Sequence, residues 1–499
     1  MSSASNTLPV PLSSSEPSES HSDDTVTTST SSESHNDDNQ LNPNSNGTIP
    51  SEKSEFDTSP NRPDDLVGKP LVAEENNDQV QPLPIVRLQQ VPRVQLRTWR
   101  ITREGLVLTG ESQMGAFLDK PKTAKTNLSG EGNGLRYAMA SMQGWRIDME
   151  DAHVVEVSMA EQEPYKDWSF FAVFDGHAGT FAADDAAENI MKTLISTPEF
   201  EKVTEELKSN GGVLCKKSIS LLENGIKRGF LLLDDIIRER LNTDRSGSTA
   251  VCAMVTPTHI IIANLGDSRA VVARKGEESF GTEDHKPYHD KERERIVSAG
   301  GSVMIQRING SLAVSRALGD FEYKNVPGLD ACRQLVSPEP DVYILERHKD
   351  KDEFLVVACD GIYDVMDNEA LCKFVESRLE VNEDLNIVCN EVLDMCLSRG
   401  SRDNMTMIIV CFDAAPKIDP EKAEAEKEWR KRIFKIIDEI LESEKAQDMI
   451  TKGDEMPVEW VVSQLAAHPN APQTSEGPSY TARSLIAQVL NQRGITHDG

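Results

Sequence analysis

Several apolar runs in this chain end abruptly at an aspartate, and this arrangement restricts the fold more than any other feature. The runs are Phe170–Phe174 before Asp175-Gly176-His177, Phe354–Cys359 before Asp360-Gly361, and His259–Ala263 shortly before Gly266-Asp267. A short continuous apolar run is typical of a strand that is buried on both faces. An isolated Asp-Gly pair is most often a turn. Several strands ending in carboxylates predict instead one acidic cluster at the rim of a sheet, and a metal ion would stabilise such a cluster.

The order of the predicted elements favours two packed sheets with helices outside them. Strands are predicted at 135–145, 154–158, 170–174, 249–255, 259–263, 270–273, 302–305, 341–345, 354–359 and 405–410. Helical spacing of apolar residues is found at 183–194, 216–241, 290–299, 371–379 and 387–395. Strands and helices therefore come in runs rather than in strict alternation. This pattern favours a sheet-on-sheet core over a doubly wound parallel sheet.

Composition divides the chain into three parts. Residues 1–113 are predicted to form a disordered acidic tail rich in Ser, Thr and Asn up to about Asp78, and then a basic, half-apolar stretch at Pro82–Gly110. That stretch is either a segment that docks on the acidic body of the protein or on a partner, or a linker with a short strand, and we favour the linker. Residues 114–413 are predicted to form the folded core. Residues 414–499 follow the Pro416 to Pro420 linker and are predicted to form a three-helix unit.

Charge and cysteine content limit the cellular setting. The formal net charge of −30 argues against a nucleic-acid binder or a protein of anionic membranes. The eight cysteines show no Cys-x-x-Cys pair and most lie in apolar runs, which indicates a reducing compartment. The chain begins without a signal peptide and contains no transmembrane segment of about 20 apolar residues. We therefore expect a monomer in the cytoplasm and/or the nucleus.

The acidic residues that follow or precede the apolar segments form a set of oxygen ligands. The carboxylates of this set belong to Glu150, Asp151, Asp175, Asp267, Asp360, Asp364 and Asp403. Oxygen ligands without cysteine suit hard cations such as Mg²⁺ or Mn²⁺ rather than zinc. Gly176 lacks a Cβ, so its backbone can approach an ion and offer its carbonyl.

Two metal ions that share a carboxylate can generate hydroxide from water and clamp a phosphoryl group. The planar guanidinium of Arg146 suits the phosphate oxygens. His177 can protonate a leaving oxygen near neutral pH. The alternative for His177 is a turn histidine whose ring binds the backbone, and the sequence favours catalysis only slightly.

Seven ordered motifs resemble one known family, the metal-dependent serine/threonine protein phosphatases of type 2C. The motifs are Arg146…Met149-Glu150-Asp151-Ala152-His153, Phe174-Asp175-Gly176-His177-Ala178-Gly179, Ser246-Gly247-Ser248-Thr249-Ala250, Gly266-Asp267-Ser268-Arg269, Ser315-Arg316-Ala317-Leu318-Gly319-Asp320, Ala358-Cys359-Asp360-Gly361 and Arg402-Asp403-Asn404. The resemblance covers about residues 114–413. The C-terminal helices resemble, less specifically, the extra unit of the animal alpha and beta forms, which could bind protein partners.

The resemblance implies an α+β fold, with a central β-sandwich of two antiparallel sheets flanked by helices and two metal ions at one end. The implied metal ligands are Asp175 as the bridge, the Gly176 carbonyl, Glu150, Asp360 and Asp403, with Asp151 acting through water and Asp267, Asp364 and Asp360 at a weaker third site. The resemblance also implies that Arg146 binds the substrate phosphate and that His177 acts as the general acid. Asp320 falls outside the metal set, and we interpret it as structural.

Two other functions are considered for this sequence: a cysteine phosphatase and a non-catalytic scaffold. Cys372 and Arg378 match the Cys-x5-Arg pattern of cysteine phosphatases, but the segment has helical apolar spacing and lacks the glycines of a phosphate-binding loop. A non-catalytic scaffold with this fold would not need the complete acid set.

Met114-Gly115 resembles the myristoylated start of the alpha form, but its glycine is internal here and Asp119 replaces the expected Ser or Thr.

We therefore predict a Mg²⁺- or Mn²⁺-dependent hydrolase of phosphoserine and phosphothreonine in proteins. The expected reaction is direct attack by a hydroxide held between two metal ions, without a phosphoenzyme. Phosphoproteins are the expected substrates.

Overall fold

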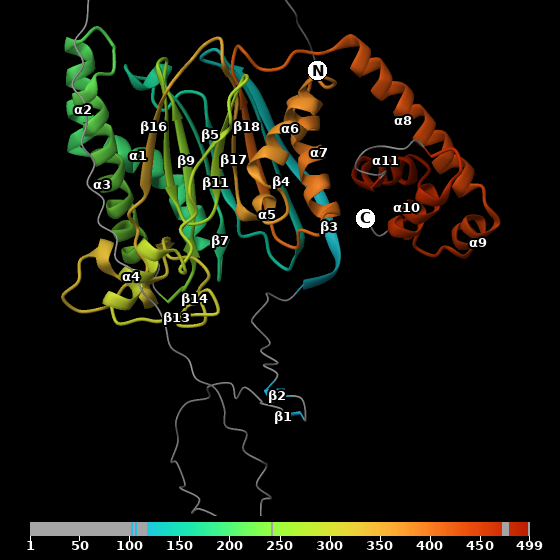
Figure 1. The fold of residues 1–499 in the computed structure, drawn as a ribbon, viewed down its shortest axis with the longest axis horizontal. Coiled ribbons are helices and arrows are strands. Elements are labelled where there is room, and N and C mark those ends of the chain that lie inside the picture. The colour runs from blue at the N-terminus through green and yellow to red at the C-terminus, as the bar shows by residue number, and fades with distance from the viewer. Residues whose placement is uncertain (1–100, 103–104, 107–116, 241–242, 472–478, 498–499) are drawn as a thin grey trace, which may run out of the picture. The chain divides into compact units, whose positions relative to one another are not determined.

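The computed structural model describes residues 101–102, 105–106, 117–240, 243–471 and 479–497 (Figure 1). The predicted disordered tail lies outside these residues, as does most of the basic stretch Pro82–Gly110. Two short strands of that stretch are described, and they pair antiparallel: β1 (Ile101–Thr102) and β2 (Gly105–Leu106).

Two antiparallel sheets form the centre of the fold. The first has the strand order β16 (Asp341–Glu346), β10 (His259–Leu265), β9 (Ala250–Val255), β6 (Ser169–Phe174) and β5 (Ala152–Glu156). The second has the order β12 (Phe280–Gly281), β11 (Arg269–Arg274), β17 (Asp352–Ala358), β18 (Met405–Cys411), β4 (Leu135–Arg146) and β3 (Phe117–Gly132). All neighbouring strands in both sheets run antiparallel.

The apolar runs are buried on both faces because the two sheets pack against each other and also carry helices. In β6, Phe171 and Val173 lie in the core between the sheets, whereas Phe170 and Phe174 belong to the core under the first helical layer. This division follows from the period-two alternation of side chains along a strand. The continuous apolar runs therefore correctly predicted strands with two buried faces.

Helices cover the outer face of each sheet (Figure 1). The first sheet packs against α1 (Phe181–Ile195), α2 (Pro198–Ser209) and α3 (Lys216–Arg240) through one apolar cluster. The second sheet packs against α5 (Asp360–Tyr363), α6 (Asn368–Leu379) and α7 (Leu385–Ser398) through another. The predicted sandwich of two antiparallel sheets flanked by helices is confirmed.

A smaller region between β12 and β16 has its own apolar cluster, which includes Ile296, Ile308 and Val336. It contains α4 (Asp290–Ser298), the hairpin β13 (Val303–Met304) and β14 (Arg307–Ile308), and the 3₁₀ turns η2 (Phe321–Tyr323) and η3 (Ala331–Arg333). A three-stranded sheet of order β15 (Leu318–Gly319), β8 (Gly247–Ser248) and β7 (Gly176–His177) joins this region to the segment after β6.

The C-terminal helices form a separate apolar cluster. Three helices are predicted here, whereas the described residues form four. They are α8 (Pro420–Leu441), α9 (Glu444–Lys452), α10 (Val458–Ala467) and α11 (Ser479–Gln492). The helix α9 is the one that the sequence pattern did not predict. Asp419 caps α8 by accepting from the Glu421 amide at 2.9 Å, and Pro420 at the first helical position needs no amide partner. Among the described helices, none has the length and apolar character that a bilayer span requires.

Candidate metal centre

The register of the central strands brings the predicted acidic residues together at one end of the sheets. Ala152, the first residue of β5, pairs with Phe174, the last residue of β6, so Asp151 and Asp175 are neighbours. In the facing sheet, Ala358 at the end of β17 pairs with Met407 of β18. Asp360 follows the end of β17, and Asp403 precedes the start of β18. Because these strands are antiparallel neighbours, both acids lie at the same end of the sheet.

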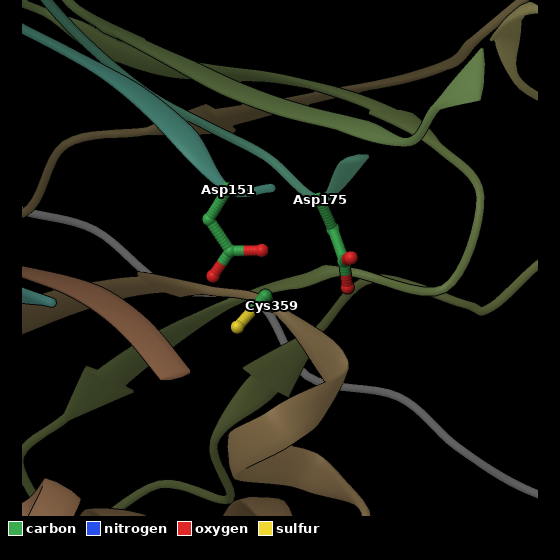
Figure 2. Close-up of side chains that lie close together, drawn as sticks. All are labelled: Asp151, Asp175 and Cys359. Carbon is green, nitrogen blue, oxygen red and sulfur yellow. The ribbon is translucent and has the colours of Figure 1, made fainter. Parts of the chain in front are cut away.

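Figure 2 shows the inner part of this cluster. One ligand atom each from Asp151, Asp175 and Cys359 lie within 4.8 Å of one another. The Thr406 hydroxyl donates to Asp151 Oδ2 at 2.7 Å. Asp151 Oδ1 is buried and has no hydrogen-bond partner among the described residues. A buried carboxylate oxygen without a partner is costly, and a cation would satisfy it.

The cluster is electrostatically strained without a cation. Burial raises the pKa of Asp175 well above its usual value, and repulsion from Asp151, Asp403 and Asp267 raises it further. Burial likewise raises the pKa of Asp360 well above its usual value, again with neighbouring carboxylates adding to the shift. The pKa of Asp151 rises to about 7, mainly through burial. Positive charge at this point would reverse these shifts.

Gly176 and Glu150 meet at the edge of the cluster. A Cβ on Gly176 would overlap the carbonyl oxygen of Glu150, so only glycine allows this backbone approach. Glu150 Oε1 accepts from the Gly179 amide at 2.7 Å, and the Glu150 amide donates to Asn404 Oδ1 at 2.9 Å. The backbone of Glu150 therefore lies against Gly176, and its carboxylate is held by the Gly179 amide.

Asp267 and Asp364, the predicted third-site residues, share their region with a lysine that the sequence analysis did not identify. Lys286 Nζ lies 2.5 Å from Asp267 Oδ2, and both side chains are mostly buried. Burial raises the pKa of Asp364, the Lys286 charge lowers it, and the Asp267 charge raises it again. An ammonium group therefore already neutralises part of the acidic charge here.

Arg146 and Asp403 form a direct ion pair at the exposed side of the cluster. Arg146 Nη2 donates to Asp403 Oδ2 at 2.6 Å. The guanidinium carries further N–H groups beyond Nη2, and its side chain is 32% exposed. Arg146 can therefore hold a metal ligand in place and still bind an anion such as a phosphate.

His177 is bound to an acid that the sequence analysis interpreted as structural. His177 Nε2 and Asp320 Oδ2 are 2.8 Å apart. Burial lowers the pKa of His177, but the charge and hydrogen bond of Asp320 outweigh this, together with Asp267 and Glu150, so the pKa lies above its usual value. The alternative reading of His177 as a turn histidine whose ring binds the backbone does not describe this contact.

Cys359 contributes sulfur to the cluster, yet the donor set remains one for hard cations. Burial raises the pKa of Cys359 well above its usual value, so the thiol stays protonated near neutral pH. Its sulfur accepts from the Thr406 amide at 3.1 Å. The remaining groups are carboxylates and backbone carbonyls, which fit Mg²⁺, Mn²⁺ or Ca²⁺ better than zinc.

The rival cysteine site is excluded by its position. Cys372 and Arg378 both lie in the regular helix α6. Burial raises the pKa of Cys372 to about 11, so a nucleophilic thiolate is disfavoured there. The Cys-x5-Arg match is a coincidence of helical sequence.

A two-sheet sandwich with a buried carboxylate cluster, a nearby arginine and an acid-bound histidine defines a class of metal-dependent hydrolases that act on phosphate esters. Comparison with known proteins agrees with this class. Residues 135–405 match the family described as "Protein phosphatase 2C". Residues 406–491 match "Protein serine/threonine phosphatase 2C, C-terminal domain".

Individual relatives agree with the family matches. The chain is 55% identical to Protein phosphatase ppm-1.A of Caenorhabditis elegans over 85% of its own length and 90% of the relative. It is 45% identical to human Protein phosphatase 1B, over 77% of this chain and 85% of that protein. It is 46% identical to human Protein phosphatase 1A, over 76% of this chain and 95% of that protein.

The chain belongs to the protein phosphatase 2C family of metal-dependent serine/threonine phosphatases. It is a hydrolase that acts on phosphoproteins. The recognition of this family from the seven sequence motifs is thereby confirmed.

Proposed function

We propose that this phosphatase uses two Mg²⁺ or Mn²⁺ ions, held by Glu150, Asp151, Asp175, the Gly176 carbonyl, Asp360 and Asp403, with a weaker third site at Asp267, Asp364 and Asp360. The single observation that carries the proposal is the buried carboxylate cluster with the unpartnered Asp151 Oδ1. When bound, the ions supply Lewis-acid activation of water and neutralise charge on the phosphoryl group.

The roles of the two flanking side chains follow from their surroundings. We assign binding of the substrate phosphate to Arg146. Asp403 fixes the position of this side chain, which remains partly exposed. We assign protonation of the leaving seryl or threonyl oxygen to His177, which is 29% exposed and has a raised pKa. Water would attack phosphorus directly, so no side chain would carry the phosphoryl group.

The first test measures phosphate release from a phosphothreonine peptide with Mn²⁺ or Mg²⁺, and then with excess chelator. Release should require the metal and should fall at least about 100-fold in Asp360→Asn, because the substitution removes a ligand charge. Asp330→Asn is a matched control, since Asp330 is exposed and pairs with Arg333 in the smaller region. Undiminished release from Asp360→Asn would refute the ligand assignment.

The absence of a phosphoenzyme is tested separately. Wild-type protein is mixed with substrate labelled on phosphorus and quenched in denaturant within one turnover. We expect all label to appear as inorganic phosphate or substrate. Label that stays covalently attached to the chain would overturn direct attack by water.

We further propose that the catalytic part spans residues 114–413 and the helical part 414–499, and that the protein is a monomer of the cytoplasm and/or nucleus. The cysteines support a reducing compartment, since all eight are unpaired and most are buried. Light scattering after size-exclusion chromatography measures the oligomeric state. Imaging of a fluorescently tagged chain measures the location, and a secretory pattern would contradict it.

A further inference from the structure

The contact between His177 and Asp320 joins two segments that are 143 residues apart in the sequence. The Asp320 carboxylate is 6% exposed, whereas the His177 side chain is 29% exposed. The ring is therefore reachable from solvent, while the acid that binds it is enclosed. This asymmetry is expected when one group meets a substrate and the other holds it from behind.

The small sheet β15-β8-β7 is built so that this contact can form. His177 of β7 pairs with Gly247 of β8, and Gly247 pairs with Gly319 of β15, immediately before Asp320. A Cβ on Gly247 would overlap both Asp320 Oδ2 and His177 Nε2. The middle strand thus lacks a side chain at the one position where the two outer side chains meet across it.

The backbone at Asp320 adopts a conformation that L-residues rarely take. Its φ is +50°, and that of Gly319 is +74°. A left-handed conformation is unfavourable for a residue that carries a Cβ. The adjoining residues hold it in place: the Asp320 amide donates to the Ser246 carbonyl at 3.2 Å, and the Gly319 amide donates to Asp234 Oδ1 at 2.9 Å.

The carboxylate of Asp320 is not used for the structural task that its position offers. Asp320 is the N-cap of the turn η2, where an aspartate commonly accepts a hydrogen bond from a turn amide. The Asp320 side chain makes no such capping bond. Its carboxylate instead faces the His177 ring, so the strained conformation serves the histidine rather than the turn.

We propose that Asp320 is a positioning residue for His177. Its Oδ2 accepts the hydrogen on Nε2 and so fixes the ring orientation, which leaves Nδ1 to face the leaving oxygen. The inference rests on the proposed role of His177 as the proton donor. In the step, water forms the new P–O bond and releases a proton to solvent, the bond from phosphorus to the seryl or threonyl oxygen breaks, and the Nδ1 proton moves to that oxygen.

The test compares two substrates that differ in their need for a proton. A threonyl alkoxide leaves only with a proton, whereas p-nitrophenolate is a stable anion and leaves without one. In Asp320→Asn, kcat for a phosphothreonine peptide should fall about 10- to 100-fold, while kcat for p-nitrophenyl phosphate should change less than about threefold. Asparagine is chosen because it tolerates the left-handed conformation. Asp330→Asn is again the matched control and should leave both rates unchanged.

A double-mutant cycle separates positioning from a general structural effect. If Asp320 acts through His177, the double variant with Asp320→Asn and His177→Gln should be no slower than His177→Gln alone. Losses that multiply, or an equal loss on both substrates in Asp320→Asn, would overturn the inference. If His177→Gln itself slows both substrates equally, the proton-donor role in the proposed function fails instead.

A measurement on wild-type protein needs no substitution at Asp320. Long-range ¹H–¹⁵N spectra report which ring nitrogen carries the hydrogen, and comparison with His177→Gln assigns the signals of this ring. The neutral ring should carry its hydrogen on Nε2. A neutral ring with its hydrogen on Nδ1 would contradict the arrangement proposed here.

Discussion

At the scale of single residues, the site balances negative charge with the protein's own cations. Arg146 pairs with Asp403, and Lys286 pairs with Asp267. Both acids are predicted metal ligands, but the Arg146 side chain is 32% exposed and keeps further N–H groups for an anion, whereas Lys286 is mostly buried against Asp267. Lys286 therefore competes with a divalent cation for the same carboxylates.

Replacing Lys286 should strengthen metal binding at the Asp267 side of the centre. In Lys286→Met, titration calorimetry should show Mn²⁺ binding about three- to tenfold more tightly, because about 1 kcal/mol of competing charge interaction is removed. Lys291→Met is the control, since Lys291 is exposed and 3.6 Å from Asp341. Weaker Mn²⁺ binding in Lys286→Met would show instead that the ammonium orients Asp267 for the metal.

At the scale of elements, the smaller region between β12 and β16 depends on one buried acid of α4. Glu292 accepts from Arg316 Nη2 at 2.8 Å, from Arg295 Nη1 at 2.6 Å and from the Ser315 hydroxyl at 2.7 Å. Burial alone would raise the pKa of Glu292, but these partners lower it to about 2. The region is therefore tied together by a carboxylate that must remain ionised.

The shift at Glu292 predicts how acid affects stability. Its pKa in the folded state lies below its ordinary value, so the stabilisation is complete above the ordinary pKa of about 4.5 and is lost as the pH falls toward about 2. The difference of about 2.5 pKa units corresponds to about 3 kcal/mol. Urea unfolding should show Glu292→Gln to be less stable at about pH 7, with a gap from wild type that narrows as the pH is lowered below about 4.5.

The control for this prediction lies on the same helix. Glu294 is exposed on α4. The Glu294→Gln variant should have the same free energy of unfolding as the wild type, both at about pH 7 and below about pH 4.5. A gap between Glu292→Gln and wild type that stays constant with pH would show that the carboxylate charge is not the stabilising feature.

The sequence predicted the central strands well because their continuous apolar runs match burial on two faces. It missed β3, the edge strand of the second sheet, whose polar residues are largely exposed and which pairs with β4 on one side. It also missed α2 and α9, two short helices rich in charged residues with only a few buried apolar side chains. The few apolar residues of both helices do recur at helical spacing, so these helices were missed because charged residues dominate their composition.

The predicted acids of the site could be read from the strand ends, whereas their partners could not. Lys286 and Asp320 reach the site from the smaller region, and Asp320 does so through a left-handed backbone that its residue type does not reveal. The close approach at Gly247 likewise depends on two other strands. Such contacts arise from tertiary packing, so a local pattern carries no record of them.

At the scale of the whole molecule, the described C-terminal helices have their own core but contact the sandwich through a charged cluster. Glu391 of α7 accepts from Arg430 Nη2 of α8 at 2.5 Å and lies 3.7 Å from Arg378 of α6. Glu426 of α8 also contacts both arginines. The Glu391 side chain is only 8% exposed, and burial raises its pKa even though both arginines lower it, so the carboxylate depends on these partners to stay ionised.

Neutralising Glu391 should loosen the attachment of α8 while leaving the metal centre intact. Glu391→Gln leaves two half-buried arginines facing one remaining acid, which destabilises the junction. Limited proteolysis should cleave the segment Ala414–Asp419 several times faster than in the wild type, with metal-dependent phosphate release unchanged. Glu428→Gln on the exposed side of α8 is the matched control and should be cleaved at the wild-type rate. Equal cleavage of Glu391→Gln and wild type would mean that the packing of α11 against α7, rather than this charged cluster, holds the helices to the sandwich.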